Sequence, residues 1–225
     1  MPHSDNTKVM SQERKLELLT ALFFTVLISA ALLGGKLISI FGIGMSVGIF
    51  MFPLTFFIVN IIEESIGQGN AKKFIRLGLI SLVVVYIFTL ISTRLEPNDK
   101  YLAYNQAYSF VFSSSWRIIA ATLITFWLSQ RFNIRAFHYF KKKIQHYPAL
   151  NGTWLCLPHN VSIILSQLVE TAVFVFIAFY GSNDSSDFWP LIKIIIPYWL
   201  IKSLLTTIAT PIYYYGVRWL KGKTV

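Results

Sequence analysis

The sequence predicts an all-α, polytopic membrane protein with six transmembrane helices and both termini in the cytoplasm. Of its 225 residues, 55% are hydrophobic and only 13% are charged, whereas about a quarter of the residues in soluble domains are charged. Several apolar runs are long enough to cross the hydrocarbon core, and they lack the alternation of membrane β-barrel strands. Lysine and arginine flank these runs, so the net charge of +10 indicates membrane orientation and not nucleic-acid binding.

Six apolar runs form a single predicted transmembrane domain, residues 16–219. A polar cytoplasmic tail, residues 1–15, precedes it, and a basic cytoplasmic tail, residues 220–225, follows it. Proline removes a backbone donor from a helix, so we expect the last span to kink or break at Pro197, with Pro211 as a second candidate. The expected spans are residues 16–35, 44–64, 75–92, 108–130, 160–180 and 189–215.

The distribution of lysine and arginine sets the predicted orientation. Fourteen of these residues fall in the N-terminal tail, the second and fourth connections and the C-terminal tail, against three in the other connections. The fourth connection, residues 131–143, is the most basic and is expected to be a loop. Because cytoplasmic connections carry the excess of positive charge, both termini are expected in the cytoplasm, as an even number of spans requires.

The end of the second span carries a polar face. Asn60, Glu63, Glu64 and Gly67 are spaced i, i+3, i+4, i+7, so a helix places them on one side. Carboxylates and amides in such a helix usually face a bundle interior or a water-filled cavity, because contact with lipid is costly. Asn60 and both glutamates are therefore candidate binding residues. Spacing alone does not decide which glutamate faces the interior and which lies among the headgroups.

The fifth span repeats this spacing with Gln167, Glu170, Thr171 and Phe174. Glu170 lies near the centre of the run, where an ionised group costs roughly 3 kcal/mol on insertion scales. We interpret this face as part of a binding site. The alternative is that Glu170 is protonated or paired only to pack helices together.

Two basic residues lie inside other spans. Arg117 is too deep in the fourth span to be a flank, and the three serines before it favour an inward-facing polar site, with outward snorkelling as the alternative. Lys202, near the middle of the sixth span, is a candidate ion-pair partner for Glu170 or for the glutamates of the second span. Opposite charges spread over several helices predict one shared polar cavity.

The sequence gives little support for ATP hydrolysis, metal or cofactor binding, or proteolysis. There is no phosphate-binding glycine loop of the ATPase kind, and Cys156 is the single cysteine, so we expect no metal, no cofactor and no enzymatic activity. His138, His146 and His159 are expected to be solvated or interfacial. Intramembrane proteases with paired glutamates need an arginine shortly after the pair, and residues 65–69 contain none.

Five short motifs occur in succession along the chain, within or beside four of the predicted spans. They are Phe52-Pro-Leu-Thr-Phe56 followed by Asn60, Glu64 and Gly67; Ala71-Lys-Lys73; Arg117-Ile-Ile-Ala120; Ser166-Gln-Leu-Val-Glu170-Thr-Ala-Val-Phe174; and Pro211-Ile-Tyr213. In this order and spacing they resemble the signature of the queuosine-precursor transporter family, also called the vitamin-uptake-transporter family. The resemblance covers nearly the whole chain, and the family's acidic residue falls on Glu64.

Two positions depart from the family pattern. The family usually has aspartate where Asn60 and Glu170 stand. The second change keeps the charge and adds one methylene, whereas the first removes a charge. Coupling to protons and the choice of substrate are therefore both left open by the resemblance.

The resemblance implies uptake of a deazaguanine base, a queuosine precursor, through the lipid bilayer of the bacterial inner membrane, with a homo-oligomer left open. A guanine-like ring offers a ring N–H and an exocyclic amine to a carboxylate, a carbonyl to a donor, and faces that stack on aromatic rings. Our hypothesis is that Glu170 or Glu64 accepts from the base edge and that Asn60, Gln167 and Arg117 complete the polar contacts. Phe56 and Phe174 are candidate stacking partners, with packing in the core as the alternative for each.

Two other classes of protein remain as alternatives. The first is the substrate-binding membrane subunit of an ATP-driven vitamin or nucleobase importer, which needs separate ATPase subunits. The second is a membrane enzyme acting on lipid or peptide, for which the motifs supply no assembled nucleophile and base.

Overall fold

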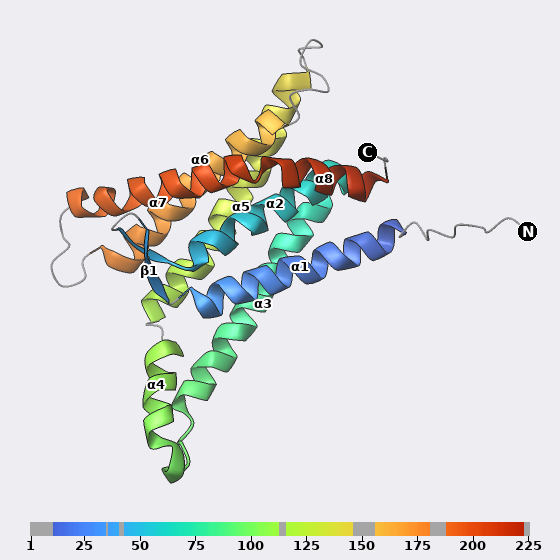
Figure 1. Ribbon diagram of the computed structural model, residues 1–225. Helices are drawn as coiled ribbons and strands as arrows, with labels where there is room; N and C mark the ends of the chain where they lie inside the picture. Colours follow the sequence, from blue (N-terminus) through green and yellow to red (C-terminus); the bar gives the residue numbers. More distant parts are fainter. Residues whose placement is uncertain are drawn as a thin grey trace, which may run out of the picture.

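The computed structural model describes residues 11–34, 36–40, 43–112, 116–145, 156–180 and 188–222. Helices make up most of this part of the chain, with one short β-hairpin between the first two (Figure 1). In chain order the elements are α1 (Gln12–Leu33), β1 (Leu37–Ile40), β2 (Ile43–Ser46), α2 (Gly48–Ile66), α3 (Gln68–Arg94), the 3-10 turn η1 (Asp99–Tyr101), α4 (Leu102–Phe112), α5 (Trp116–Gln145), α6 (Cys156–Phe179), α7 (Phe188–Ile208) and α8 (Thr210–Lys221).

Five of these helices, α1, α2, α3, α6 and α7, are long and apolar enough to cross a membrane. A sixth span results if α4 and α5, which are bent by 40° relative to each other, count as one. The expectation of an all-α polytopic membrane protein is confirmed, with five or six spans among the described residues.

Residues 131–143 form part of α5, so the expectation of a basic loop there was wrong. The helix continues because buried and exposed side chains recur there at helical spacing. Asn133, Ile134 and Phe137 are buried on one side, whereas Arg135 and His138 are exposed on the other. The basic side chains therefore lie on the solvated face of a helix that extends beyond the apolar region.

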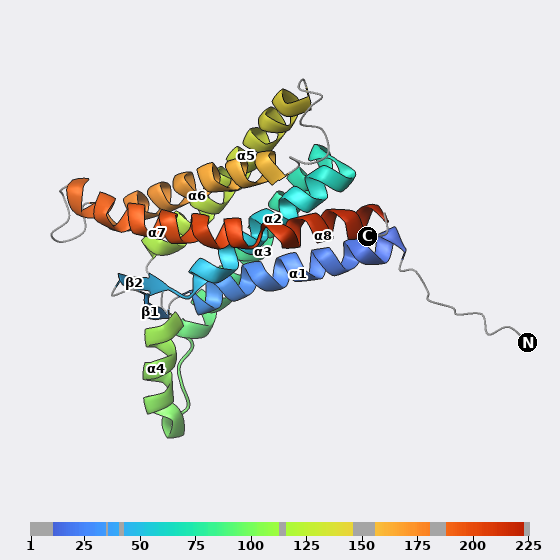
Figure 2. The same ribbon diagram turned by 45° about the horizontal axis from the view of Figure 1, so that its top comes forward.

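Two expected spans are divided in the structure. Residues 108–130 include the end of α4, which lies along the end of α3 and away from the other helices (Figures 1 and 2). Residues 189–215 are divided at Ala209 between α7 and α8, whereas α7 is continuous through Pro197. Pro211 lies in the first turn of α8, where a backbone N–H would have no partner within the helix, so a proline is tolerated there.

The β-hairpin was not expected from the sequence. Its strands pair antiparallel, with Leu37 opposite Ser46. Ser46 links three helices, because its Oγ donates to the Gly34 carbonyl (2.6 Å) and accepts from the Gly48 N–H (3.0 Å), while its own N–H donates to the Tyr198 hydroxyl (2.8 Å). The hairpin therefore ties the end of α1 and the start of α2 to α7.

α2 lies at the centre of the molecule and contacts α1, α3, α5, α6, α7 and α8 (Figure 2). Its side chains Phe56, Phe57, Val59 and Ile62 are almost completely buried. α7 and α8 follow one another along one side of α2, and α1 lies on its other side (Figure 1). A polar side chain on α2 is therefore enclosed by other helices.

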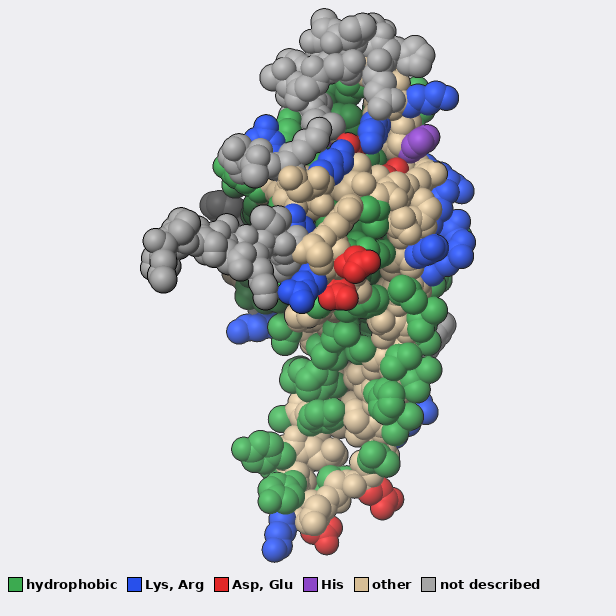
Figure 3. Space-filling view, turned by 90° about the vertical axis from the view of Figure 1, so that its right-hand side faces the viewer, with side chains coloured by type: hydrophobic (Ala, Val, Ile, Leu, Met, Phe, Trp, Pro, Cys, Tyr) green, Lys and Arg blue, Asp and Glu red, His purple; other side chains and the backbone are tan. Residues whose placement is uncertain are grey.

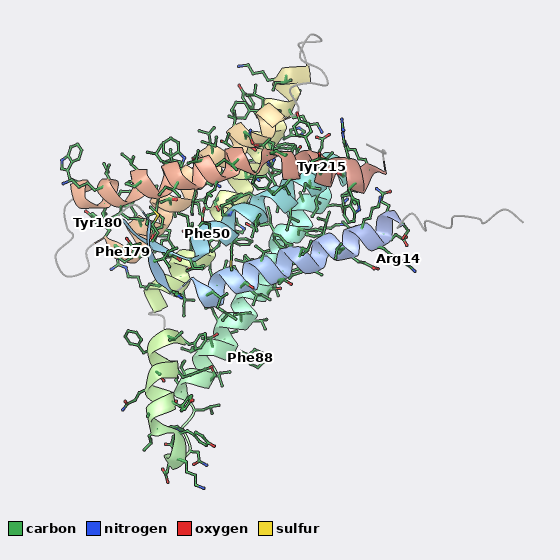
Figure 4. The ribbon with its side chains drawn as sticks, viewed as in Figure 1. Arg14, Phe50, Phe88, Phe179, Tyr180 and Tyr215 are labelled. Carbon is green, nitrogen blue, oxygen red and sulfur yellow. The ribbon has the colours of Figure 1, made fainter. Side chains whose placement is uncertain are left out.

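The start of α1 and the end of α8 lie at the same end of the molecule. The Lys15 ammonium donates to the Trp219 carbonyl at 2.6 Å, and the Lys15 side chain is buried. Lysine and arginine side chains surround this end (Figure 3). Phe179 and Tyr180 at the end of α6 lie at the opposite end from Arg14 at the start of α1 (Figure 4).

Candidate functional site

A stripe of buried polar residues runs along α6. His159, Ser162, Ser166, Gln167 and Glu170 are all at most 7% exposed, and they recur at the spacing of one helical face. This face meets α2, α5 and α7, each of which contributes buried polar side chains of its own. The stripe is therefore the polar interior of a four-helix arrangement within an otherwise apolar protein.

One end of the stripe carries a buried ion pair between α6 and α7. Glu170 Oε2 lies 2.9 Å from Lys202 Nζ. The Lys202 ammonium also lies 5.8 Å from the centre of the Phe52 ring on α2. About one turn away, the Gln167 amide donates to the Thr206 hydroxyl at 2.8 Å. Of the partners considered for Lys202, the structure selects Glu170 and not the glutamates of α2, and the pairing explains how both charges are held inside the bundle.

The other end of the stripe centres on Asn60 of α2. Its Oδ1 accepts from Asn133 Nδ2 of α5 at 2.6 Å. Its Nδ2 lies 3.2 Å from His159 Nδ1 and 3.3 Å from Ser162 Oγ, both on α6. The His159 ring stacks on Tyr213 of α8, with ring centres 3.6 Å apart. Asn60 therefore joins three helices through one amide.

Between these two ends, Gln130 of α5 donates to the Thr55 hydroxyl of α2 at 3.0 Å. Several buried polar atoms of α5, α6 and α7 make no hydrogen bond within the described part of the chain. Either ordered water or a polar solute can satisfy such atoms. Those on amide and imidazole groups are Gln130 Oε1, Asn133 Oδ1, His159 Nε2 and Gln167 Oε1.

Glu63 and Glu64 lie at the end of α2, beyond Asn60. Glu64 forms ion pairs with Lys221 of α8 (2.7 Å) and with Lys141 of α5. Glu63 is 6% exposed, and its carboxylate oxygens make no hydrogen bond within the described residues. The structure therefore places Glu64 in a three-helix ion-pair cluster at the basic end, separate from the Glu170–Lys202 pair.

Arg117 does not join the polar interior. Its Nε donates to the Ile177 carbonyl at 2.5 Å, and its Nη2 donates to the Tyr180 carbonyl. These carbonyls end α6, where backbone acceptors lack partners within the helix and attract a cation. The three serines before Arg117 lie outside the described residues. The single cavity expected for all the charged residues is therefore corrected to three separate sites.

The two phenylalanines proposed to stack on a base lie in apolar surroundings. Phe56 is 1% exposed and belongs to the central apolar core. Phe174 is half-buried and packs against the cluster of Val175, Leu191 and Ile195 between α6 and α7. Both positions fit helix packing.

The sequence-based interpretation missed several residues of the interior. His159 was expected to be solvated or interfacial, but it is fully buried. His138 is exposed, as expected, and His146 lies outside the described residues. Gln130 was interpreted as a span end, and Asn133 fell in the supposed loop. The available signal was their i, i+3 spacing, which continues the face of Thr125 and Ser129.

This architecture defines a multi-pass membrane protein with a polar interior, and no cluster of potential metal ligands occurs within the described residues. Residues 46–216 match the family described as "Putative vitamin uptake transporter". The chain belongs to this family of transporters, and the resemblance noted from its motifs is confirmed.

A curated relative supports the same conclusion. Over 179 residues the chain is 25% identical to the "Probable queuosine precursor transporter" of Bacillus subtilis (strain 168), covering 80% of this chain and 74% of the relative. No solved structure matches the chain.

Proposed function

We propose that this protein imports a queuosine precursor, a deazaguanine base, across the bacterial inner membrane, and that the base passes between α2, α5, α6 and α7. Family membership supports transport, and the name of the Bacillus subtilis relative supports the class of substrate. The polar stripe of α6 is the feature of this chain that suits a flat, hydrogen-bonding solute.

The observation that carries the proposal is the buried Glu170–Lys202 pair beside Gln167. The pair uses Glu170 Oε2, and a carboxylate has acceptor sites on both oxygens. A guanine-like base presents a ring N–H and an exocyclic amine on one edge, which a carboxylate can accept together. The amide oxygen of Gln167, which has no donor among the described residues, offers a further acceptor about one turn away.

Asn60 takes the position at which the family usually has aspartate. As an amide it both accepts from Asn133 and donates towards His159 and Ser162, whereas a carboxylate could only accept. We infer that the solute meets a neutral network at this end and a charged pair at the other. Proton coupling, if present, then depends on a residue other than Asn60.

The charge distribution supports an orientation with the basic end in the cytoplasm. Under this orientation the Glu64 pairs with Lys141 and Lys221 lie on the cytoplasmic side and join the ends of α2, α5 and α8. We assign Glu64 to closure of the cytoplasmic exit, with Glu63 beside it, and not to contact with the bound base. Arg117 lies at the opposite end, against the last carbonyls of α6.

Uptake of a labelled deazaguanine base tests the proposal, in cells that neither make nor import it by another route. The wild-type chain should restore uptake, and Glu170→Ala should abolish it, whereas Thr207→Ala, on the exposed face of α7, should have little effect. Full uptake by Glu170→Ala would remove Glu170 from the site.

Transport by the purified chain in liposomes separates the remaining classes of protein. A subunit of an ATP-driven importer would be inactive without its ATPases. A membrane enzyme would release an altered product, whereas a transporter releases the base unchanged. Unchanged base inside liposomes that contain only this chain is the expected result.

A further inference from the structure

A groove runs between α1 and α8, with α2 as its floor, and has a volume of about 790 Å³. The two helices lie on either side of α2 and meet where Lys15 donates to the Trp219 carbonyl (Figure 1). From there the groove extends along α1 as far as Val26, a distance of about 16 Å at the rise of an α-helix. The groove is therefore elongated and begins at the basic end of the molecule.

The walls of the groove are apolar and accessible from outside the protein. Leu18 and Leu22 of α1 are both 46% exposed, and Ile212 of α8 is 58% exposed. Ile58 and Ile61 of α2 form the buried floor. Because α1 and α2 are both long and apolar enough to cross a membrane, these side chains meet hydrocarbon and not water. An acyl chain in the groove would cover them without the loss of any polar contact.

The basic end of the groove carries two cations. Lys15 and Arg218 both line it, and none of its lining residues is acidic. Glu13 and Glu17 each lie two residues from Lys15, so a helix turns them to its opposite side. Arg218 is exposed and has no ion-pair partner among the described residues. The described part of the protein therefore leaves the charge of Arg218 uncompensated.

An anionic phospholipid matches this combination of features. A phosphate accepts charge-assisted hydrogen bonds from a guanidinium, and basic pockets between transmembrane helices bind anionic headgroups. Trp219 also lines this end of the groove, and tryptophan is enriched at the level of the headgroups. A zwitterionic lipid supplies the same hydrocarbon without net charge, so it matches the walls of the groove but not its basic end.

We propose that the groove between α1 and α8 binds an anionic phospholipid, with one acyl chain along α2 and the phosphate at Arg218. Lys15 adds its charge to the same end while it donates to Trp219. The bound lipid joins α1 to α8 beyond their contact at Lys15 and stabilises the bundle from outside. This role goes beyond the proposed function, because it does not depend on the identity of the transported solute.

Retention of lipid by the purified protein tests the headgroup site. Native mass spectrometry from micelles with equal amounts of phosphatidylglycerol and phosphatidylcholine should show at least about a fivefold preference for phosphatidylglycerol. Arg218→Gln should reduce the preference to within about twofold. Arg14→Gln, the matched control, removes an exposed cation at the same end that is not among the lining residues, and should leave the preference unchanged (Figure 4). Equal retention of the two lipids by the wild type, or equal loss of the preference in both variants, would overturn the proposal.

Bulky side chains on the groove wall test the acyl chain separately. Leu18→Trp with Leu22→Trp narrows the groove and should lower the retention of both lipids. Ile80→Trp with Val84→Trp, at the same spacing on the exposed face of α3, should have little effect. Undiminished retention of phosphatidylglycerol by the α1 variant would contradict the proposal, and so would its conversion of a dimer to a monomer, which would make a second copy of the chain the occupant. If the α1 variant does not fold, the comparison of Arg218→Gln with Arg14→Gln still decides.

Discussion

Glu170 on α6 and Lys202 on α7 form an ion pair with 2.9 Å between Oε2 and Nζ, and both side chains are buried. Other helices enclose both charges, so each depends on the other for its stability inside the bundle. Substitutions at these two positions can therefore test both the stability of the protein and its transport activity.

Removal of Lys202 alone should destabilise the protein more than removal of both charges. Lys202→Met leaves the Glu170 carboxylate buried and unpaired, which costs about 3–5 kcal/mol, whereas Lys202→Met with Glu170→Gln should recover most of this loss. Unfolding of the purified variants in detergent measures the difference. The double variant should still fail to import the base, because the carboxylate is gone. If the double variant recovers both stability and uptake, the pair serves only helix packing and not transport.

Glu64→Gln should slow uptake without weakening binding of the base. The substitution removes both ion pairs, with Lys141 and Lys221, at the end of α2. Both lysines are partly exposed, so each pair should contribute no more than about 1 kcal/mol to stability. A dissociation constant within about twofold of wild type, together with reduced uptake, is the expected result. A large rise in the dissociation constant would instead return Glu64 to the binding site.

Asn133→Leu should destabilise the protein and disturb the Asn60 network. Asn60 Oδ1 loses its donor at 2.6 Å and stays buried, which costs about 1–3 kcal/mol. His138→Ala, on the exposed face of the same helix, is the matched control and should change the free energy of unfolding by less than about 0.5 kcal/mol. Equal effects of the two substitutions on thermal unfolding would argue against a structural role for the buried amide.

Lys15→Ala should loosen the contact between α1 and α8. The buried ammonium donates to the Trp219 carbonyl at 2.6 Å and lies 5.5 Å from the centre of the Trp219 ring. Loss of a charge-assisted hydrogen bond should cost about 1.5–3 kcal/mol. Arg14→Ala removes an exposed cation from the preceding position and should have almost no effect on detergent unfolding (Figure 4). A large effect of Arg14→Ala would mean that total charge matters here more than this contact.

The candidate site could be predicted in part. Glu170 was one candidate partner of Lys202, beside the glutamates of the second span, because both residues lie deep in apolar runs, where a charge needs a partner. His159 and Asn133 were missed because they lie near the ends of apolar runs, where polar residues ordinarily meet water or headgroups. The extension of α5 past its apolar part buried Asn133 and also brought Lys141 to Glu64.

The sequence by itself determined the all-helical membrane class, most of the spans and the polar faces of the second and fifth spans. These follow from hydrophobicity and from a period of 3.6 residues, which are local properties. Only the tertiary structure decided which polar faces meet: that Asn60 contacts His159, 99 residues away, and that Arg117 caps α6 and does not face Glu170. Periodicity orients a side chain around its own helix axis, whereas its partner depends on how distant helices pack, and no local pattern encodes that packing.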